Sequence, residues 1–273
     1  ATFTGLSPAL PTVVLASIAT VVVTAALRSW LAPVALPPLS LPFLAVFYLL
    51  LGAAGLARLP YGPFLSTASV LDSVLPDLVL AYLRTLGSLF FLARADAGLL
   101  VLVALTVNSR IGTALSLLSF GAVVILDRHV LSLADGSMLH VLGYNAVLTG
   151  IALGGVWFVP SRSSFLLAVF GVLVGTLVTV GSMPALARVG APVLILPFNA
   201  TMFLAFLAMR QRTRDENPKA VDFLMGTPEE NLDYYRTRVA RFGGIRPMRF
   251  AAPFLGTWPV SYTHLTLPTS DLV

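Results

Sequence analysis

The sequence predicts an all-α integral membrane protein, and three observations lead to this prediction. Of its 273 residues, 57% are hydrophobic and only 11% are charged, whereas a soluble domain carries about 25% charged residues. The apolar residues form long continuous runs, without the alternation over about ten residues that is typical of a membrane barrel. Because only helices and closed barrels satisfy every backbone polar group in lipid, these runs favour helices.

Apolar segments set the expected positions of the helices, at about 12–27, 39–57, 78–92, 97–107, 111–126, 139–159, 165–187 and 191–209. Several are shorter than the roughly 20 residues that a membrane span requires. Prolines punctuate them, namely Pro11, Pro33, Pro37, Pro42, Pro76, Pro160, Pro184, Pro192 and Pro197. Broken helices occur in a bilayer only where they are buried in protein or line a cavity. The pattern favours a transport fold, and a packed bundle of kinked helices is the alternative.

An internal repeat sharpens this prediction. Residues 34–49, VALPPLSLPFLAVFYL, align with residues 189–204, VGAPVLILPFNATMFL, at an offset of 155 with eight identities in sixteen positions. The identities include both prolines and the Phe of a Leu-Pro-Phe element. Tandem repeats of this kind are typical of transporters that bind their substrate between two halves. Nothing ahead of residue 1 can match residues 78–160, so we expect the first repeat to be truncated.

The expected organisation follows from the repeat. We expect a two-repeat transporter or channel fold with re-entrant half-helices. Its parts are the end of the first repeat at 1–57, an inter-repeat loop at 58–77, the second repeat at 78–209, a charged linker or start of a further domain at 210–260, and a tail at 261–273. The tail resembles a translated sequencing adapter and is expected to be non-native.

The region after residue 209 is rich in charge. It holds nine of the 17 Lys and Arg residues, so the positive-inside rule predicts that it is cytoplasmic. Acidic residues are interleaved with the basic ones, which does not indicate nucleic-acid binding. Thr227 as cap, Pro228 in the first turn, and Glu229 and Glu230 at the positive end of the dipole predict a helix that starts here.

Three motifs resemble those of the urea transporter family: YLRTLGSLFF at 82–91, VLGYNAVLTGIALGG at 141–155 and LILPFNATMFL at 194–204. Each repeat of that family carries a motif close to Gly-Gln-Val-Phe-Phe, a Gly-Phe-Asn-x-x-Leu-x-Gly motif and a Leu-Thr-Leu-Pro-Phe motif. The resemblance covers roughly residues 10–209. It implies a passive, channel-like pore for urea in each protomer of a homotrimer, in a plasma membrane such as the bacterial inner membrane, with no cofactor, metal or catalysis.

The resemblance also implies roles for individual residues. Phe91 takes the place of the slot aromatic on the pore helix, and Tyr144 and Leu148 form a wall one helical turn apart. Urea is flat and neutral, so such a site needs aromatic faces and hydrogen-bond acceptors rather than charges. Asn145 is expected to orient backbone groups of a broken helix. Structural roles are implied for the two Leu-Pro-Phe elements: Pro42, Phe43, Pro197, Phe198 and Asn199.

Three candidate pore residues depart from the family pattern. Ser88 stands where the pore helix has Gln or Glu, Ile195 replaces the Thr before Leu-Pro-Phe, and Ser40 is its counterpart in the first repeat. Ile195 offers no side-chain oxygen, so the substrate is expected to be urea or a related small neutral solute. The hydroxyl of Tyr144, where the family has Phe, is a candidate replacement for one lost acceptor.

Other residues have plainer interpretations. Gly150 and Gly154, like Gly171 and Gly175, are expected to allow close helix packing. Arg84 and Arg110 are expected at the membrane interface, and His129 and His140 lack metal-ligand spacing. Asp72 and Asp77 are expected to be solvated or to cap the pore helix. Alternative functions are a structural membrane bundle and a transporter fused to a zinc metallopeptidase, for which residues 248–261 faintly resemble the lead-in.

Overall fold

The computed structural model describes residues 10–34, 36–57, 68–132, 138–212, 217–221 and 226–242. In these residues the regular structure is helical, apart from one isolated β-bridge between Phe158 and Ala220. Four of the described helical stretches are long and apolar enough to cross a membrane: Val13–Val34, Arg110–Leu131, Leu139–Val156 and Arg162–Arg188. The prediction of an all-α membrane protein is therefore confirmed. The peptidase-like stretch at 248–261 and the expected tail lie outside the described residues.

Each expected apolar segment contains a helix. These helices are α1 (Leu10–Leu31), α2 (Leu41–Ala57), α3 (Asp77–Ser88), α4 (Ala95–Asn108), α5 (Arg110–Leu126), α6 (Leu139–Ile151), α7 (Arg162–Arg188) and α8 (Leu196–Arg210). Short helical turns extend or join them: η1 (Ala32–Val34), η2 (Val70–Ser73), η3 (Asp127–Leu131) and η5 (Ala152–Val156). At 12 residues α3 is too short to cross a bilayer.

Proline acts in two ways along these helices. Pro11, Pro42 and Pro197 are the second residues of α1, α2 and α8, where the missing N–H has no intrahelical partner to lose. Pro184 differs, because it lies inside α7 and the helix continues through it to Arg188. Three of these four prolines therefore mark the start of a helix, and Pro184 marks no boundary.

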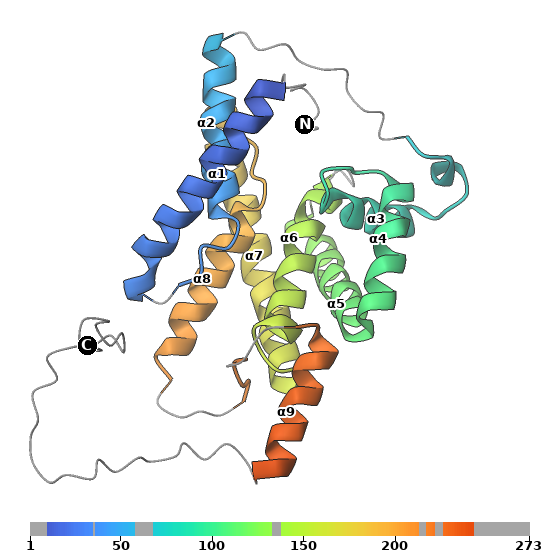
Figure 1. Cartoon of the computed structure of the whole chain (residues 1–273). Helices are drawn as coiled ribbons and strands as arrows, with labels where there is room; N and C mark the ends of the chain where they lie inside the picture. Colours follow the sequence, from blue (N-terminus) through green and yellow to red (C-terminus); the bar gives the residue numbers. More distant parts are fainter. Residues whose placement is uncertain are drawn as a thin grey trace, which may run out of the picture. The chain divides into compact units, whose positions relative to one another are not determined.

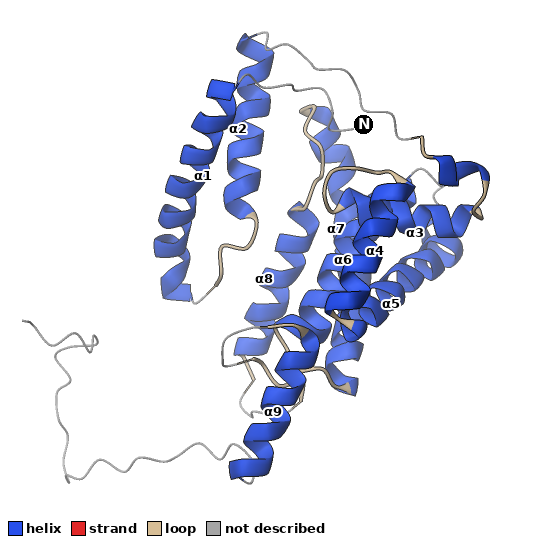
Figure 2. Cartoon of the chain, turned by 45° about the vertical axis from the view of Figure 1, so that its right-hand side comes forward, coloured by secondary structure: helices blue, strands red, loops and turns tan. Residues whose placement is uncertain are grey.

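Helix α6 lies in the middle of the helices that follow residue 77, in contact with α3, α5, α7 and α8 (Figures 1 and 2). Glycines make this close packing possible. A Cβ atom added to Gly150 would lie 1.7 Å from Ser119 Oγ, and one added to Gly171 would lie 2.4 Å from Leu153 Cδ1. The expected packing role of these glycines is what the structure shows.

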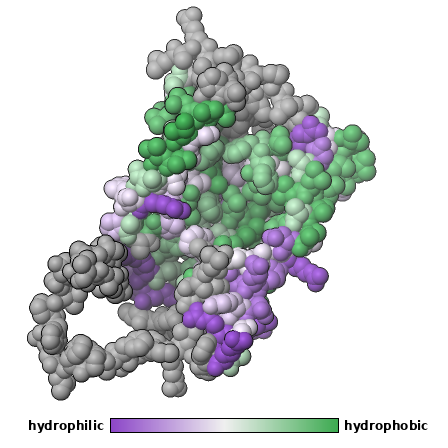
Figure 3. All heavy atoms as spheres, viewed as in Figure 1, coloured by the Kyte–Doolittle hydropathy of each residue, from purple (hydrophilic) through white to green (hydrophobic). Residues whose placement is uncertain are grey.

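The chain before residue 58 contributes α1 and α2, which pack against each other, and α2 also contacts α8 (Figure 1). The Tyr48 hydroxyl on α2 donates a hydrogen bond of 2.8 Å to the carbonyl of Pro192, just ahead of α8. Hydrophobic side chains cover α4 and α5 in Figure 3, as expected for helices that face lipid.

Helix α9 (Pro228–Phe242) starts where the sequence predicts. The Glu230 amide donates to Thr227 Oγ1 at 3.3 Å, and Glu230 Oε2 accepts from the Thr227 amide at 2.7 Å, which is a capping box. Hydrophilic side chains gather over α9 in Figure 3. By its internal contacts the chain divides into residues 1–236 and 237–273, so the start of α9 belongs to the same unit as the membrane helices.

The start of α9 is fastened to the membrane helices by two side chains. Glu229 accepts hydrogen bonds of 2.6 Å from both the Ser109 hydroxyl and the Ile111 amide, at the first turn of α5. The Asn231 side chain, 0% exposed, donates to the carbonyl of Gly155 at 2.8 Å. Residues 226–231, termed the docking segment below, therefore pack on the ends of α5 and η5.

Candidate functional site

A non-helical segment separates α7 from α8 and is called a break below. The turn of this break that leads into α8 contains Leu194, whose backbone is left-handed at φ 47°. Asn145 on α6 holds both sides of it. The Asn145 side-chain nitrogen donates to the Leu194 carbonyl at 2.9 Å, and its oxygen accepts from the Phe198 amide at 3.2 Å. Asn145 is only 2% exposed, so without these bonds the two backbone groups would lie unpaired in an apolar interior, at about 1–3 kcal/mol each.

A second amide, Asn199, joins this break to the chain ahead of α2. Its nitrogen donates to the Ile195 carbonyl at 2.8 Å and to the Ser40 hydroxyl at 2.7 Å. Its oxygen accepts from the Ser40 backbone amide at 3.1 Å. Asn199 therefore links the break before α8 to the break before α2, through Ser40, which is 159 positions away in the sequence.

The two breaks have the same backbone conformation. Leu39 has φ 46° and Leu194 has φ 47°, and these residues are 155 positions apart. Helix α2 begins at Leu41 and helix α8 at Leu196, which is the same separation. The offset read from the sequence alignment therefore relates two segments that fold alike, although their side chains differ at Ser40 and Ile195.

Phe91, the predicted slot aromatic, follows the C-terminal end of α3. Its φ of 61° is left-handed, a conformation that costs a non-glycine residue roughly 1–2 kcal/mol. Its ring packs on that of Phe43 near the start of α2, with centroids 5.5 Å apart and planes tilted by 36°. A flat solute held between two rings needs about 7 Å, twice the carbon contact distance, so these two rings touch each other and leave no slot between them.

Tyr144 and Leu148 lie one turn apart on α6, as expected. Tyr144 is buried at 9% exposure and Leu148 is half-buried. Gly143 precedes Tyr144 and brings α6 close to α3, because a Cβ atom at Gly143 would lie 2.5 Å from Thr85 Oγ1. The position of this wall therefore depends on a glycine at the α3–α6 contact.

The hydroxyl of Ser88 donates to the Arg84 carbonyl at 2.7 Å within α3. Its hydrogen is therefore used by its own helix, and its oxygen keeps capacity to accept. Ile195 contributes only its backbone carbonyl, which accepts from the Asn199 side chain and amide. Of the three departures from the family pattern, Ser40 is the one whose side chain contacts the other break.

Arg84 and Asp72 form an ion pair of 3.0 Å between α3 and the turn η2. The sequence predicted an interfacial position for Arg84 and did not predict this partner. Asp72 also caps η2 by accepting from the Ser69 amide at 3.0 Å. That bond, aided by Arg84 and opposed by desolvation, lowers the pKa of Asp72. Asp77 is the first residue of α3, and the cap position ahead of it is Pro76.

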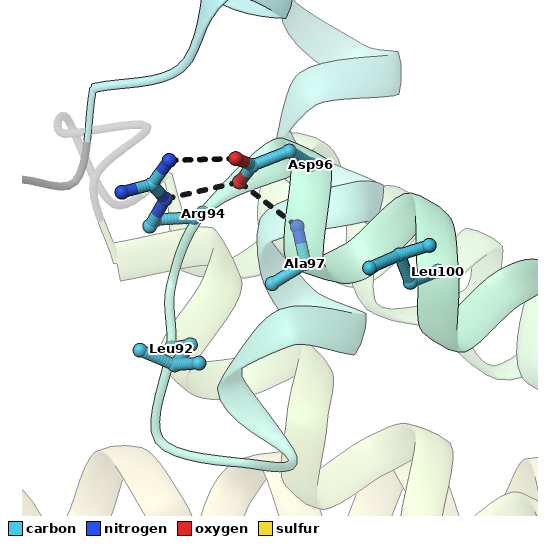
Figure 4. A pocket seen from close by; sticks show the side chains of 5 residues that line it. All are labelled: Leu92, Arg94, Asp96, Ala97 and Leu100. Atoms are coloured by element: carbon cyan, nitrogen blue, oxygen red, sulfur yellow. Dashed lines mark hydrogen bonds and ion pairs between the residues drawn. The ribbon is translucent and has the colours of Figure 1, made fainter.

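A second ion pair lies beside a hollow of about 400 Å³ near the start of α4 (Figure 4). Arg94 binds Asp96 through two hydrogen bonds, of 3.0 and 2.6 Å, and the Ala97 amide donates to the same carboxylate (Figure 4). The residues lining the hollow are Leu92, Arg94, Asp96, Ala97 and Leu100. None of them is a predicted pore residue, although Leu92 directly follows Phe91 in the chain.

Within the described parts of the chain, no three His, Asp or Glu residues are close enough together to hold a metal ion. The contacts that the sequence did not predict are those between distant segments, such as Ser40 with Asn199 and Tyr48 with Pro192. One signal for the first of them was present. In the repeat alignment Ser40 and Asn199 are polar where their counterparts, Ile195 and Leu44, are apolar.

Comparison with known families identifies most of this architecture. A family model described as urea transporter matches residues 3–211, which include α1 to α8. No protein in a search of curated sequences matches the chain. The matched region contains all the predicted pore residues, from Ser40 to Asn199, and ends ahead of the docking segment.

Proposed function

The chain belongs to the urea transporter family, and from this premise we propose that it conducts urea, or a similar small neutral amide, passively through a channel-like pore. Its place in a membrane follows from the four helices that are able to span one.

The observation that carries the proposal is the pair of helix breaks at Leu39 and Leu194. Each break opens the N-terminal turn of a helix, which carries the positive end of the helix dipole. The amides of Ser40, Phe198 and Asn199 are already paired with protein groups, so it is the dipole that favours a solute carbonyl oxygen here, without requiring a charged substrate. Asn145 and Asn199 hold both turns in place through hydrogen bonds of 2.7–3.2 Å.

Aromatic and aliphatic side chains supply the flat surfaces. Phe91 and Phe43 are 48% and 36% exposed, and Tyr144 with Leu148 forms the α6 wall. Because the two phenylalanine rings touch at 5.5 Å, one ring must turn aside when a flat solute passes. We assign Phe91 and Phe43 as the aromatic constriction and Pro42, Pro197 and Phe198 as the scaffold of the breaks.

Hydrogen-bond acceptors are fewer than in the family pattern. Ser40 and Ser88 each keep a side-chain oxygen, and Ile195 has none. A solute with several N–H donors, such as urea, therefore finds fewer side-chain acceptors than the family pattern provides. This loss extends the candidate substrates to small amides that present fewer donors than urea.

Passive conduction is supported by the positions of the acidic residues. Among the described residues, those in apolar helices lie near the ends: Asp96 is the second residue of α4, and Asp127 follows α5 in the stretch Arg110–Leu131. Proton-coupled transporters place ionisable groups well inside the membrane. We further propose a homotrimer in the plasma membrane, with the basic region after residue 209 on the cytoplasmic side.

The test is stopped-flow shrinkage of proteoliposomes that contain the full-length protein, with urea or glycerol as the osmolyte. We expect urea to permeate at least tenfold faster than glycerol, because glycerol is not flat and presents hydroxyls rather than amide groups. Protein-free liposomes give the background. Equal permeability to the two solutes would contradict the proposed function.

The Tyr144 hydroxyl is tested by Tyr144→Phe in the same assay. If this hydroxyl replaces a lost acceptor, its removal costs one hydrogen bond of about 1 kcal/mol, or about fivefold in flux. Leu148→Met, which keeps an apolar side chain of similar volume, is the control for disturbing the wall. Unchanged urea flux in Tyr144→Phe would show that the hydroxyl does not contact the solute.

A further inference from the structure

Asn199 uses its whole amide group at the contact between the two breaks. Its nitrogen donates to the Ser40 hydroxyl and to the Ile195 carbonyl, and its oxygen accepts from the Ser40 amide. The side chain is 1% exposed. An amide with two N–H groups and one oxygen engaged in this way has one orientation, so Asn199 fixes Ser40 in position as well as direction.

The repeat does not account for this contact. At the offset of 155, Asn199 corresponds to Leu44 and Ser40 corresponds to Ile195. Leu44 is itself buried, at 3% exposure, so the matching site in the first repeat is apolar. The link between the breaks is therefore one-sided, and a symmetric pair of half-sites does not require it.

The link also sets the chemistry of the Ser40 oxygen. One of its lone pairs accepts the Asn199 N–H, which leaves one lone pair and its own O–H for another partner. The corresponding residue, Ile195, has no side-chain oxygen. Of the two equivalent positions, 40 and 195, only position 40 carries a hydroxyl. Asn199 determines where that hydroxyl lies.

We propose that Asn199 is a positioning residue that fixes the start of α2 against the start of α8 through Ser40, and thereby sets the solute selectivity of the pathway. The proposal rests on the proposed function, since it concerns the width and the hydrogen bonding of the same pathway. It assigns selectivity to a contact between the repeats rather than to either repeat alone. Loss of the contact lets the two helix starts move apart and admits solutes larger than urea.

The chain offers matched variants for the test. Asn199→Leu introduces the residue found at position 44, which has the same branching but is apolar and larger, and Ser40→Ala removes only the hydroxyl. Ser40→Thr keeps a hydroxyl at the same atom. Tyr48→Phe removes a different link between α2 and the segment before α8, the bond to the Pro192 carbonyl, and introduces the residue type found at the corresponding position, Phe203.

Selectivity is measured as the ratio of urea to N-methylurea permeability in proteoliposomes of the full-length protein. We expect this ratio to fall at least fivefold in Asn199→Leu, which removes the whole contact, and by a smaller factor in Ser40→Ala, which keeps the bond from the residue 40 amide to Asn199. We expect no further fall in the double variant beyond that of Asn199→Leu, because the two changes act on one contact. We expect Tyr48→Phe to keep the ratio within twofold of the unaltered protein, and we expect Ser40→Thr, which retains a hydroxyl, to lower the ratio less than Ser40→Ala does. Unfolding temperature is recorded for every variant.

A purely structural role predicts a different result. Asn199→Leu would then melt earlier and conduct less of both solutes at an unchanged ratio, and this outcome overturns the proposal. If Asn199→Leu does not fold, an unchanged permeability ratio in Ser40→Ala also overturns the proposal. An unaltered protein that passes urea and glycerol equally contradicts the proposed function instead, and the two failures are therefore distinguishable.

Discussion

Asn145 and Asn231 bind interrupted backbone in the same way, in two different parts of the molecule. Asn145 lies on apolar α6 and bridges the Leu194 carbonyl and the Phe198 amide. Asn231 lies on charged α9 and bridges the Gly155 carbonyl and the Gly226 amide, at 2.8 and 3.0 Å. Their exposures are nearly equal, at 2% and 0%.

The two sites differ in whether water could pair with the backbone carbonyl and amide that each side chain now binds. Around Asn145 the neighbouring helices are apolar and pack tightly enough to leave the residue 2% exposed, so little water can reach the freed backbone groups. Around Asn231 the docking segment belongs to a helix with charged, exposed residues such as Asp233 and Arg236. Equal burial therefore does not mean equal cost, because the cost depends on whether water can reach the unpaired groups.

The largest expected effect is that of Asn145→Leu. The change leaves the Leu194 carbonyl and the Phe198 amide unpaired in an apolar interior, and we expect a loss of about 3 kcal/mol in unfolding free energy, from 1–3 kcal/mol for each group. Urea flux is also expected to fall, because the break loses its support. Thermal unfolding in detergent, followed by tryptophan fluorescence, measures the first effect. A loss below about 1 kcal/mol would show that the break does not need Asn145.

A smaller effect is expected for Asn231→Leu. Water can reach the end of η5 once the docking segment loosens, so we expect a loss of about 1–2 kcal/mol. Urea flux through the full-length protein is expected to change less than twofold, since Asn231 contacts no predicted pore residue. The same melting assay applies. A loss as large as that of Asn145→Leu would remove the distinction between the two regions.

The smallest effect is expected for Glu229→Gln, which keeps the shape of the side chain and removes its charge. The carboxylate of Glu229 lies at the N-terminal turn of α5, where an anion contributes about 0.3–1 kcal/mol to the free energy of unfolding. Desolvation raises the pKa of Glu229, but the hydrogen bonds from the Ile111 amide and the Ser109 hydroxyl outweigh it and lower the pKa overall. The charge therefore stabilises the docking segment at neutral pH.

The sign of the pH dependence follows from that lowered pKa. A carboxyl group whose pKa is lower in the folded state contributes its full stability above the unfolded pKa, about 4.3 for Glu, and loses it as the pH falls through the folded value. We expect the difference in unfolding temperature between Glu229→Gln and the unaltered protein to be largest near pH 7, to decline as the pH falls below about 4.3, and to vanish only once the pH is below the folded-state pKa. A difference that persists there would indicate a steric effect instead.

The positions of the helices could be predicted from the sequence. Each expected apolar segment contains a helix, and the cap at Thr227 and Glu230 marked the start of α9, because both signals depend on neighbouring residues. Proline was less informative, since Pro184 lies inside α7. Within the candidate site, the offset of 155 located both breaks, and the family motifs drew attention to Asn145 and Asn199.

Only the tertiary structure decided which polar groups form hydrogen bonds with each other. The sequence by itself determined an all-α membrane protein with two similar broken segments, because hydropathy, helix length and proline position act within a few turns of chain. The partners of Asn199 and Glu229 are 159 and 118–120 residues away, and no local pattern specifies them. Those contacts exist because close packing of helices leaves buried polar groups no water, so each must find a partner among the segments that folding brings beside it.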